Sequence, residues 1–218
     1  MTIENIIVEN MPAIVLSPKT AKGIVILTHG YGGNKEEQLG LAWKIAQSGL
    51  KVYDVDLRGH GENANPLGME IKSDIDRLIK QAKTYDLPVI AIGHSLGGRL
   101  SLTSNADFAI GLSPALDFFY SERTQEVLSE MRSYRVRTSS EIAIFEILEN
   151  LAPFQPSKDN DHLIVYGSRD VPEIIRTAKY LGKTGAKIIE VENALHSDIF
   201  TLGTTAQIIN NQIQQWLN

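Results

Sequence analysis

The chain has 218 residues, of which 43% are hydrophobic and 22% charged, and its formal net charge is −5. This length predicts one domain spanning residues 1–218, and the ordinary composition excludes a disordered or fibrous chain. The chain contains no cysteine, which excludes disulfides, thiolate nucleophiles and cysteine-ligated metal centres.

The acidic balance argues against nucleic acid as a partner, because phosphate backbones are bound by clustered Lys and Arg side chains. The densest basic cluster is Arg132, Arg135 and Arg137, which we interpret as a solvated face. Residues 1–10 are acidic and predict no signal peptide, and no apolar run is long enough to span a membrane. We therefore expect a cytoplasmic protein without membrane contact, and the oligomeric state stays open.

Short apolar runs rich in β-branched residues predict the strands. The first 17 residues predict two short strands that form an antiparallel edge. Four of the later runs are apolar nearly throughout, which is typical of parallel strands covered on both faces. The later predicted strands are residues 24–28, 52–57, 89–93, 108–112, 163–166 and 187–191.

Amphipathic segments lie between these runs and predict helices. The alternation indicates an α/β fold, with a mostly parallel twisted sheet and helices on both faces. The predicted helices are residues 36–48, 70–85, 96–105, 171–181 and 205–217.

Residues 115–160 interrupt this alternation without a clear strand. The segment begins with the aromatic residues Phe118, Phe119 and Tyr120, and two amphipathic patterns follow at residues 121–134 and 140–151. A long insertion with its own helices often covers an active site, so we predict a short helical lid. The alternative is a helix pair that only extends the core.

The strongest chemical signal is the sequence GHSLG at residues 93–97, which follows a predicted strand and opens a predicted helix. This is the context of a nucleophile elbow, in which a strained turn exposes the serine hydroxyl. The two outer positions must be glycine, because side chains there would collide with neighbouring backbone. We therefore predict Ser95 as a nucleophile, the alternative being a glycine-rich turn with an incidental serine.

A serine hydroxyl needs a general base at neutral pH. The chain offers His29, His60, His94, His162 and His196. Only His196 combines a loop at the end of a predicted strand with the chain order serine, acid, histidine. We predict His196 as the base.

The base in turn needs a carboxylate to fix its tautomer. Asp170 directly follows the predicted strand at residues 163–166 and lies between Ser95 and His196 in the chain. We predict Asp170 as the acid. Asp117 is the alternative, and Asp170 could instead cap the following helix.

Two backbone amides should stabilise an oxyanion beside Ser95. One is the N–H of Leu96, and the other comes from the glycine-rich loop at residues 29–33, where we predict the N–H of Tyr31. We predict that the Tyr31 side chain lines a substrate pocket together with Phe118, Phe119 and Tyr120.

Taken together, these motifs make the chain resemble the α/β-hydrolase superfamily, and within it compact esterase, monoacylglycerol-lipase-like and serine-aminopeptidase-like members. The chain departs from many such relatives at Glu62, where they carry a small hydroxyl residue. The motifs that carry the resemblance are HGYGGNKEE at 29–37, DLRGHGEN at 56–63, GHSLGG at 93–98, YGSRD at 166–170 and ALHSD at 194–198.

The resemblance implies a serine hydrolase that needs neither a metal nor an organic cofactor, with Ser95, Asp170 and His196 as its triad and Tyr31 and Leu96 as oxyanion donors. We expect a small carboxylic ester as substrate, because the lid is short. The alternatives are acyl transfer, amide or C–C bond hydrolysis on the same triad, and a binding module of the same fold without catalysis.

Overall fold

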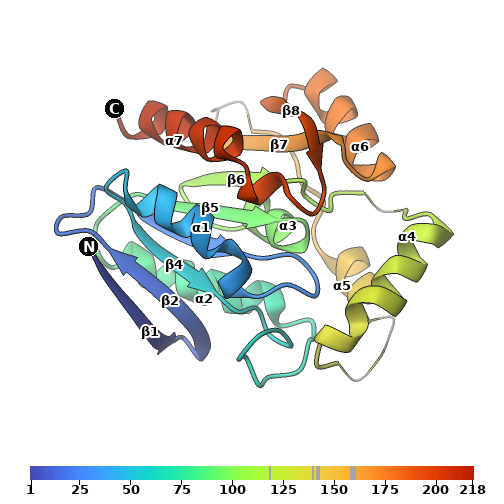
Figure 1. Cartoon of the computed structure of the whole chain (residues 1–218), viewed down its shortest axis with the longest axis horizontal. Helices are drawn as coiled ribbons and strands as arrows, with labels where there is room; N and C mark the ends of the chain where they lie inside the picture. Colours follow the sequence, from blue (N-terminus) through green and yellow to red (C-terminus); the bar gives the residue numbers. More distant parts are fainter. Residues whose placement is uncertain (118, 139, 141–142, 158–160) are drawn as a thin grey trace.

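In the computed structural model, residues 1–117, 119–138, 140, 143–157 and 161–218 are described. They form one eight-stranded sheet with strand order β1-β2-β4-β3-β5-β6-β7-β8 (Figure 1). The strands are β1 (Thr2–Val8), β2 (Met11–Ser17), β3 (Ile24–Thr28), β4 (Lys51–Val55), β5 (Val89–His94), β6 (Phe108–Leu112), β7 (His162–Arg169) and β8 (Ile188–Leu195).

The pairing confirms the predicted α/β class. β1 pairs antiparallel with β2 and β2 with β4, so the first two strands form the expected antiparallel edge. The pairings from β4 through β3, β5, β6 and β7 to β8 are parallel. The carboxyl ends of these parallel strands therefore meet at one edge of the sheet, where an open α/β sheet places its site.

Helices cover both faces of the sheet (Figure 1). Helices α1 and α7 pack on one face, and α2, α3 and α6 pack on the other. Within the described part of the chain, no helix has the length and apolar character needed to cross a membrane. These helices are α1 (Lys35–Ala46), α2 (Ile71–Lys83), α3 (Leu96–Leu102), α6 (Pro172–Lys183) and α7 (Gly203–Leu217), and a 3-10 turn, η3 (Ile199–Thr201), precedes α7.

The insertion at residues 115–160 is helical where it is described. Helix α4 (Glu122–Glu126) continues into the π-helical turn η1 (Val127–Arg132) and the 3-10 turn η2 (Ser133–Arg135), and α5 (Ala143–Asn150) follows. Apolar residues of α5 join the main core cluster beneath the sheet. The insertion therefore extends the core through α5, whereas no residue of the helical stretch from α4 to η2 is described as fully buried.

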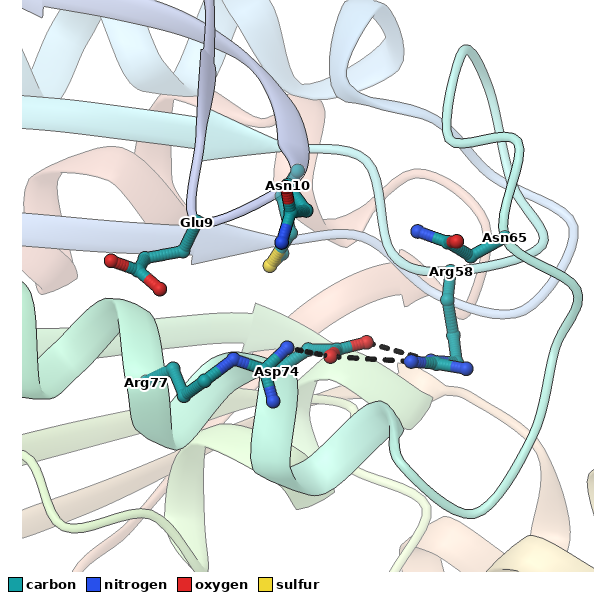
Figure 2. A pocket seen from close by; sticks show the side chains of 7 residues that line it. Glu9, Asn10, Arg58, Asn65, Asp74 and Arg77 are labelled. Carbon is teal, nitrogen blue, oxygen red and sulfur yellow. Dashed lines mark hydrogen bonds and ion pairs between the residues drawn. The ribbon is translucent and has the colours of Figure 1, made fainter.

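A polar cleft of about 330 Å³ opens beside the β1–β2 turn (Figure 2). Asp74 of α2 lies at its base and receives a bidentate pair from Arg58, with Nε–Oδ2 at 2.7 Å and Nη2–Oδ1 at 3.3 Å. Arg77, one turn further along α2, also donates to Asp74. The Asp74 carboxylate thus pairs with both guanidinium groups. Its bond to Arg58 fastens the loop after β4 to α2.

We expect Asp74→Ala to lower the free energy of unfolding by about 3 kcal/mol, because it leaves the largely buried Arg58 without its main partner. Asp76→Ala is the matched control, since it removes only an i,i+4 pair with Lys72 on the same helix and should cost about 0.5 kcal/mol. Urea unfolding of both variants measures the difference. Equal losses would show that Asp74 has no special structural role.

Candidate active site

Ser95 stands between β5 and α3 in a strained backbone conformation, with φ 52° and ψ −112°. Its N–H donates to the Leu112 carbonyl at the end of β6 (2.9 Å), and its carbonyl accepts from the amides of Arg99 and Ala115 (both 3.0 Å). A positive φ is costly for a non-glycine residue and persists only when its surroundings enforce it. These bonds from both sides hold Ser95 in that conformation.

The glycines on either side of Ser95 permit the tight turn. A Cβ at Gly93 would collide with the backbone of Gly97, and a Cβ at Gly97 would lie 2.5 Å from the carbonyl oxygens of Thr28 and His29. The strand, the turn and the start of α3 therefore approach each other as closely as backbone atoms allow, as the sequence predicts for an elbow.

Asp170 and His196 meet at the ends of the two neighbouring strands β7 and β8. His196 Nδ1 lies 2.8 Å from Asp170 Oδ1. Because a carboxylate accepts, Nδ1 carries the proton and Nε2 of the neutral ring is left as an acceptor. The Asp170 side chain is fully buried, whereas that of His196 is 27% exposed.

The Asp170 carboxylate receives donors from strand β7 and from the loops after β6, β7 and β8. Besides His196, the Val171 amide donates to Oδ1 (2.8 Å), the Gly167 amide to Oδ2 (3.2 Å), and the Ser113 hydroxyl also to Oδ2. Burial alone would raise the pKa of Asp170, but the hydrogen bonds from His196, Ser113 and the Val171 amide and the interaction with His196 hold it below its ordinary value. The carboxylate is therefore kept ionised.

His94 connects the elbow to the loop that carries His196. Its Nε2 donates to the His196 carbonyl at 2.8 Å. Its ring also lies 4.8 Å from the His196 ring and 4.9 Å from that of Phe200, measured between centroids. The hydrogen bonds described for His196 do not include one to the Ser95 hydroxyl. The described connection between His196 and the elbow is therefore made by His94, which directly precedes Ser95.

The loop after β3 approaches Ser95 at Gly30, where a Cβ would lie 3.1 Å from that of Ser95. The Gly30 carbonyl accepts from the Gly33 amide (3.0 Å) and from His29 Nδ1 (2.8 Å). The N–H of a trans peptide points opposite to its C=O, so these bonds direct the Tyr31 N–H away from the turn. The Tyr31 N–H donates to no described residue. Leu96 is the first residue of α3, and the amides of a first helical turn lack an intrahelical acceptor.

His29 is a fixed neutral imidazole. Its Nε2 accepts from the Leu57 amide (3.1 Å), so the proton resides on Nδ1. Burial lowers its pKa to about 4. The ring of His60 lies 5.0 Å from that of His29, and burial lowers the pKa of His60 to about 3. Both rings are thus held neutral by burial and have structural partners in the loops after β3 and β4.

Charged partners of the buried Lys35 tie the start of α1 to the loop after β4. Lys35 Nζ lies 2.9 Å from both Asp56 Oδ2 and Glu62 Oε2, and 2.7 Å from Glu36. The amides of Lys35 and Glu62 also donate to Asp56. Burial alone would lower the pKa of Lys35, but these carboxylates raise it. Glu62, the departure from the common motif, is thus the partner of a buried lysine.

Three of the predicted pocket residues, Tyr31, Phe119 and Tyr120, are described and differ in their exposure. The Tyr31 ring is only 6% exposed and packs edge-on against His60, 5.7 Å between centroids. Tyr120 is partly buried and its ring lies 6.5 Å from that of Phe145 of α5, between centroids, whereas Phe119 is 82% exposed. Phe118 lies outside the described residues. None of these positions tests the substrate lining, which stays a prediction.

Asp117, the alternative acid, points toward α6. Its carboxylate accepts from Arg176 (2.6 Å) and Thr177 (2.8 Å), and also from the Phe119 amide. Burial would raise its pKa, but these donors lower it. The partners described for Asp117 do not include His196, whereas Asp170 is hydrogen-bonded to His196 Nδ1.

Long-range contacts that the sequence did not predict fasten the insertion to the site. Arg99 of α3 is fully buried and donates to the carbonyls of Ala115 (3.2 Å) and Leu151 (2.9 Å), near the two ends of the insertion. Arg135 donates to the carbonyl of Gly32 (3.2 Å), next to Tyr31. The sequence predicts that Arg132, Arg135 and Arg137 form a solvated face. Arg135 is exposed, but it also binds a loop of the core.

A second arginine of that cluster makes a similar contact. Arg137 donates to the carbonyls of Gly61 and Asn63 in the loop after β4. Its backbone also pairs with Gly59 and Leu67. A pattern of charge along the sequence cannot reveal such contacts, because the accepting carbonyls lie on distant loops.

Among the described residues, no group of three or more His, Asp or Glu side chains is arranged to hold a metal ion.

A family model described as serine aminopeptidase, S33, matches residues 19–117. A monoacylglycerol lipase of Mycolicibacterium smegmatis is 28% identical over 178 residues, which cover 76% of this chain and 58% of that relative. The chain therefore spans less than two thirds of that relative's length.

Solved structures share the whole fold. A protein of Thermus thermophilus superposes with a TM-score of 0.71 and 18% identity, covering 100% of this chain and 98% of that one. A monoacylglycerol lipase of Paleococcus ferrophilus gives 0.66 at 18% identity, again covering 100% and 98%. At these identities the likeness concerns the fold.

His29 makes stability depend on pH in a defined window. Its pKa is about 4 in the folded chain against 6.5 for an ordinary histidine, so its contribution is complete above pH 6.5 and is lost as the pH falls toward 4. Near pH 4.5 we expect this residue to account for a loss of about 2 to 3 kcal/mol in unfolding free energy.

Denaturant unfolding at neutral pH and near pH 4.5 measures this loss, and His29→Gln should show a smaller one. His60 titrates in the same direction, so the variant should keep part of the pH dependence. As an independent check, the imidazole NMR signals of His29 in the folded wild type should not titrate between pH 7 and about 5. A midpoint near 6.5 would contradict the neutral assignment.

Proposed function

The chain belongs to the α/β-hydrolase superfamily, and from that premise we propose that it is a serine hydrolase that cleaves small carboxylic esters. The observation that carries the proposal is the 2.8 Å bond between His196 Nδ1 and the buried Asp170 carboxylate, together with the bond from His94, the neighbour of the strained Ser95, to the His196 carbonyl. An ionised partner fixes the His196 tautomer and stabilises the imidazolium that forms during the reaction.

In the first half of the proposed reaction, Ser95 Oγ attacks the ester carbonyl carbon and His196 Nε2 takes the hydroxyl proton. The carbonyl π electrons move to oxygen, and the Tyr31 and Leu96 amides donate to the resulting oxyanion. The tetrahedral intermediate then breaks its C–O bond to the alcohol. His196 returns the proton to the leaving oxygen, and an acyl-enzyme on Ser95 remains.

In the second half, His196 Nε2 takes a proton from water as the water oxygen attacks the acyl carbon. The same amides stabilise the second oxyanion. Collapse of this intermediate breaks the bond to Ser95 Oγ, which recovers its proton from His196, and the carboxylic acid leaves. Asp170 stays ionised throughout, because His196, Ser113 and the Val171 amide hold its pKa below the ordinary value.

The substrate class follows from the size of the insertion. We propose that residues 115–160 act as a short lid within a single domain, and that such a lid suits small acyl groups better than long lipid chains. The names of two similar proteins state activity on monoacylglycerols, so a panel of esters with increasing acyl length addresses both possibilities. We expect kcat/KM to be highest for the short acyl chains.

Replacing the nucleophile tests the core of the proposal. Ser95→Ala should reduce hydrolysis of short p-nitrophenyl esters to the uncatalysed rate, with an unchanged far-UV circular dichroism spectrum. The wild type should react covalently with a fluorophosphonate at Ser95, and the variant should not. Ser104→Ala, which changes a serine beyond α3, is the control and should keep full labelling. A folded wild type that resists the probe would instead favour a binding module.

Ser113 is predicted to position Asp170 without touching the substrate. Ser113→Ala removes one charge-assisted hydrogen bond, so kcat should fall about tenfold while KM stays unchanged. Ser101→Ala is the control: it loses another buried hydroxyl contact, with Thr28 (3.3 Å), that does not involve Asp170. Steady-state kinetics on one ester compares them. An equal effect of both variants would reduce Ser113 to a packing role.

A further inference from the structure

The strand β1 is an open edge of the sheet with exposed isoleucines. It lies at the end of the strand order and at the periphery of the molecule, away from the insertion (Figure 1). Ile3 is 51%, Ile6 42% and Ile7 75% exposed. A hydrophobic edge strand with unpaired backbone groups is a template for pairing with another strand.

The register of the β1–β2 hairpin shows which backbone groups face the open edge. The two-residue turn Glu9–Asn10 has φ values of 48° and 62°, which makes its flanking residues Val8 and Met11 a hydrogen-bonded pair. Pairs alternate along an antiparallel ladder, so Ile7, opposite Pro12, points its N–H and C=O outward. Consistently, the Pro12 carbonyl accepts from the Asp56 amide on the far side of β2.

By the same alternation, Ile3, Asn5 and Ile7 all present their N–H and C=O groups to the open edge. Their side chains share one face of the strand, because side chains alternate with a period of two. The order along this face is Ile, Asn, Ile, which reads the same in both directions. A strand with this symmetry is complementary to itself when the two copies run antiparallel.

The opposite edge of the sheet lacks these properties. β8 carries Glu190 and Glu192, and Asn193 within it has a φ of 61°. Its pairing with β7 is also irregular between Gly167 and Arg169. Charged side chains and local irregularities are the usual means of blocking edge pairing, and β1 has only Glu4 between its ends.

We propose that β1 pairs with β1 of a second copy of this chain, antiparallel about a two-fold axis at Asn5, so that one continuous sheet runs through a homodimer. Ile3 then lies opposite Ile7 of the second copy, and roughly six backbone hydrogen bonds form. Glu4 lies opposite Ile6, so no like charges face each other. A C2 interface of this kind is self-complementary.

The charges at the two ends of the edge are also complementary in this arrangement. Glu9 lies in the turn after β1, and the exposed Lys19 follows β2 at the other end of the hairpin. Neither has an ion-pair partner among the described residues. The two-fold axis brings the Glu9 end of each copy to the Lys19 end of the other.

Sedimentation equilibrium of the purified chain tests the oligomer. The wild type should approach twice the chain mass of 24.1 kDa as its concentration rises. Asn5→Pro removes an outward N–H without touching the β1–β2 bonds, so it should weaken dimerisation at least tenfold. Glu4→Ala is the control and should dimerise like the wild type. A wild type that stays monomeric overturns the proposal, as does a dimer that Asn5→Pro leaves intact.

A disulfide test fixes the register and does not depend on whether Asn5→Pro folds. Because the chain has no cysteine, Asn5→Cys introduces a single thiol, and a hydrogen-bonded antiparallel pair places its two copies about 5.5 Å apart at Cα, within disulfide range. The control Ile3→Cys places its thiols about 14 Å apart, beyond that range.

On mild oxidation, Asn5→Cys should run as a covalent dimer on non-reducing gels and Ile3→Cys should not. Equal cross-linking of the two variants would indicate random collision, and no cross-linking of Asn5→Cys would exclude the proposed register. Either result overturns the proposal.

Discussion

The buried carboxylate of Asp170 is the interaction on which the site depends. Its four donors come from β7 and from the loops after β6, β7 and β8, so one charge fixes the relative positions of three neighbouring strand ends. A buried carboxylate is tolerable only when its oxygens are satisfied. The requirement for donors therefore orders the loops, and the ordered loops in turn orient His196.

Two kinds of buried polar group surround this centre. Asp170 and Lys35 keep their charges, because opposite charges or several donors compensate for burial. His29 and His60 lose theirs, since burial makes the neutral ring the stable form. The neutral His29 can both accept and donate, which is what the loop beside Ser95 requires. Whether each of these buried side chains is charged thus depends on its hydrogen-bond and ion-pair partners and not on its residue type alone.

The sequence was sufficient for features that depend on neighbouring residues. Gly93 and Gly97 were predictable because the elbow is a local steric requirement, and the strands because buried parallel strands are apolar throughout. The partnerships of Ser113 with Asp170 and of Lys35 with Glu62 were not, because the residues lie 57 and 27 positions apart and meet only once the sheet has formed. A hydroxyl or a lysine carries no local sign of its distant partner.

The buried Arg99 has a consequence for how such a protein can change over time. Its guanidinium holds carbonyls near both ends of the insertion against the helix that begins beside Ser95. The two stems are therefore anchored independently of what lies between them. Insertions, deletions or grafted segments between the stems can change the surface of the insertion while Ser95, the proposed nucleophile, keeps its place. This arginine makes the insertion an exchangeable module, open to both natural divergence and engineering.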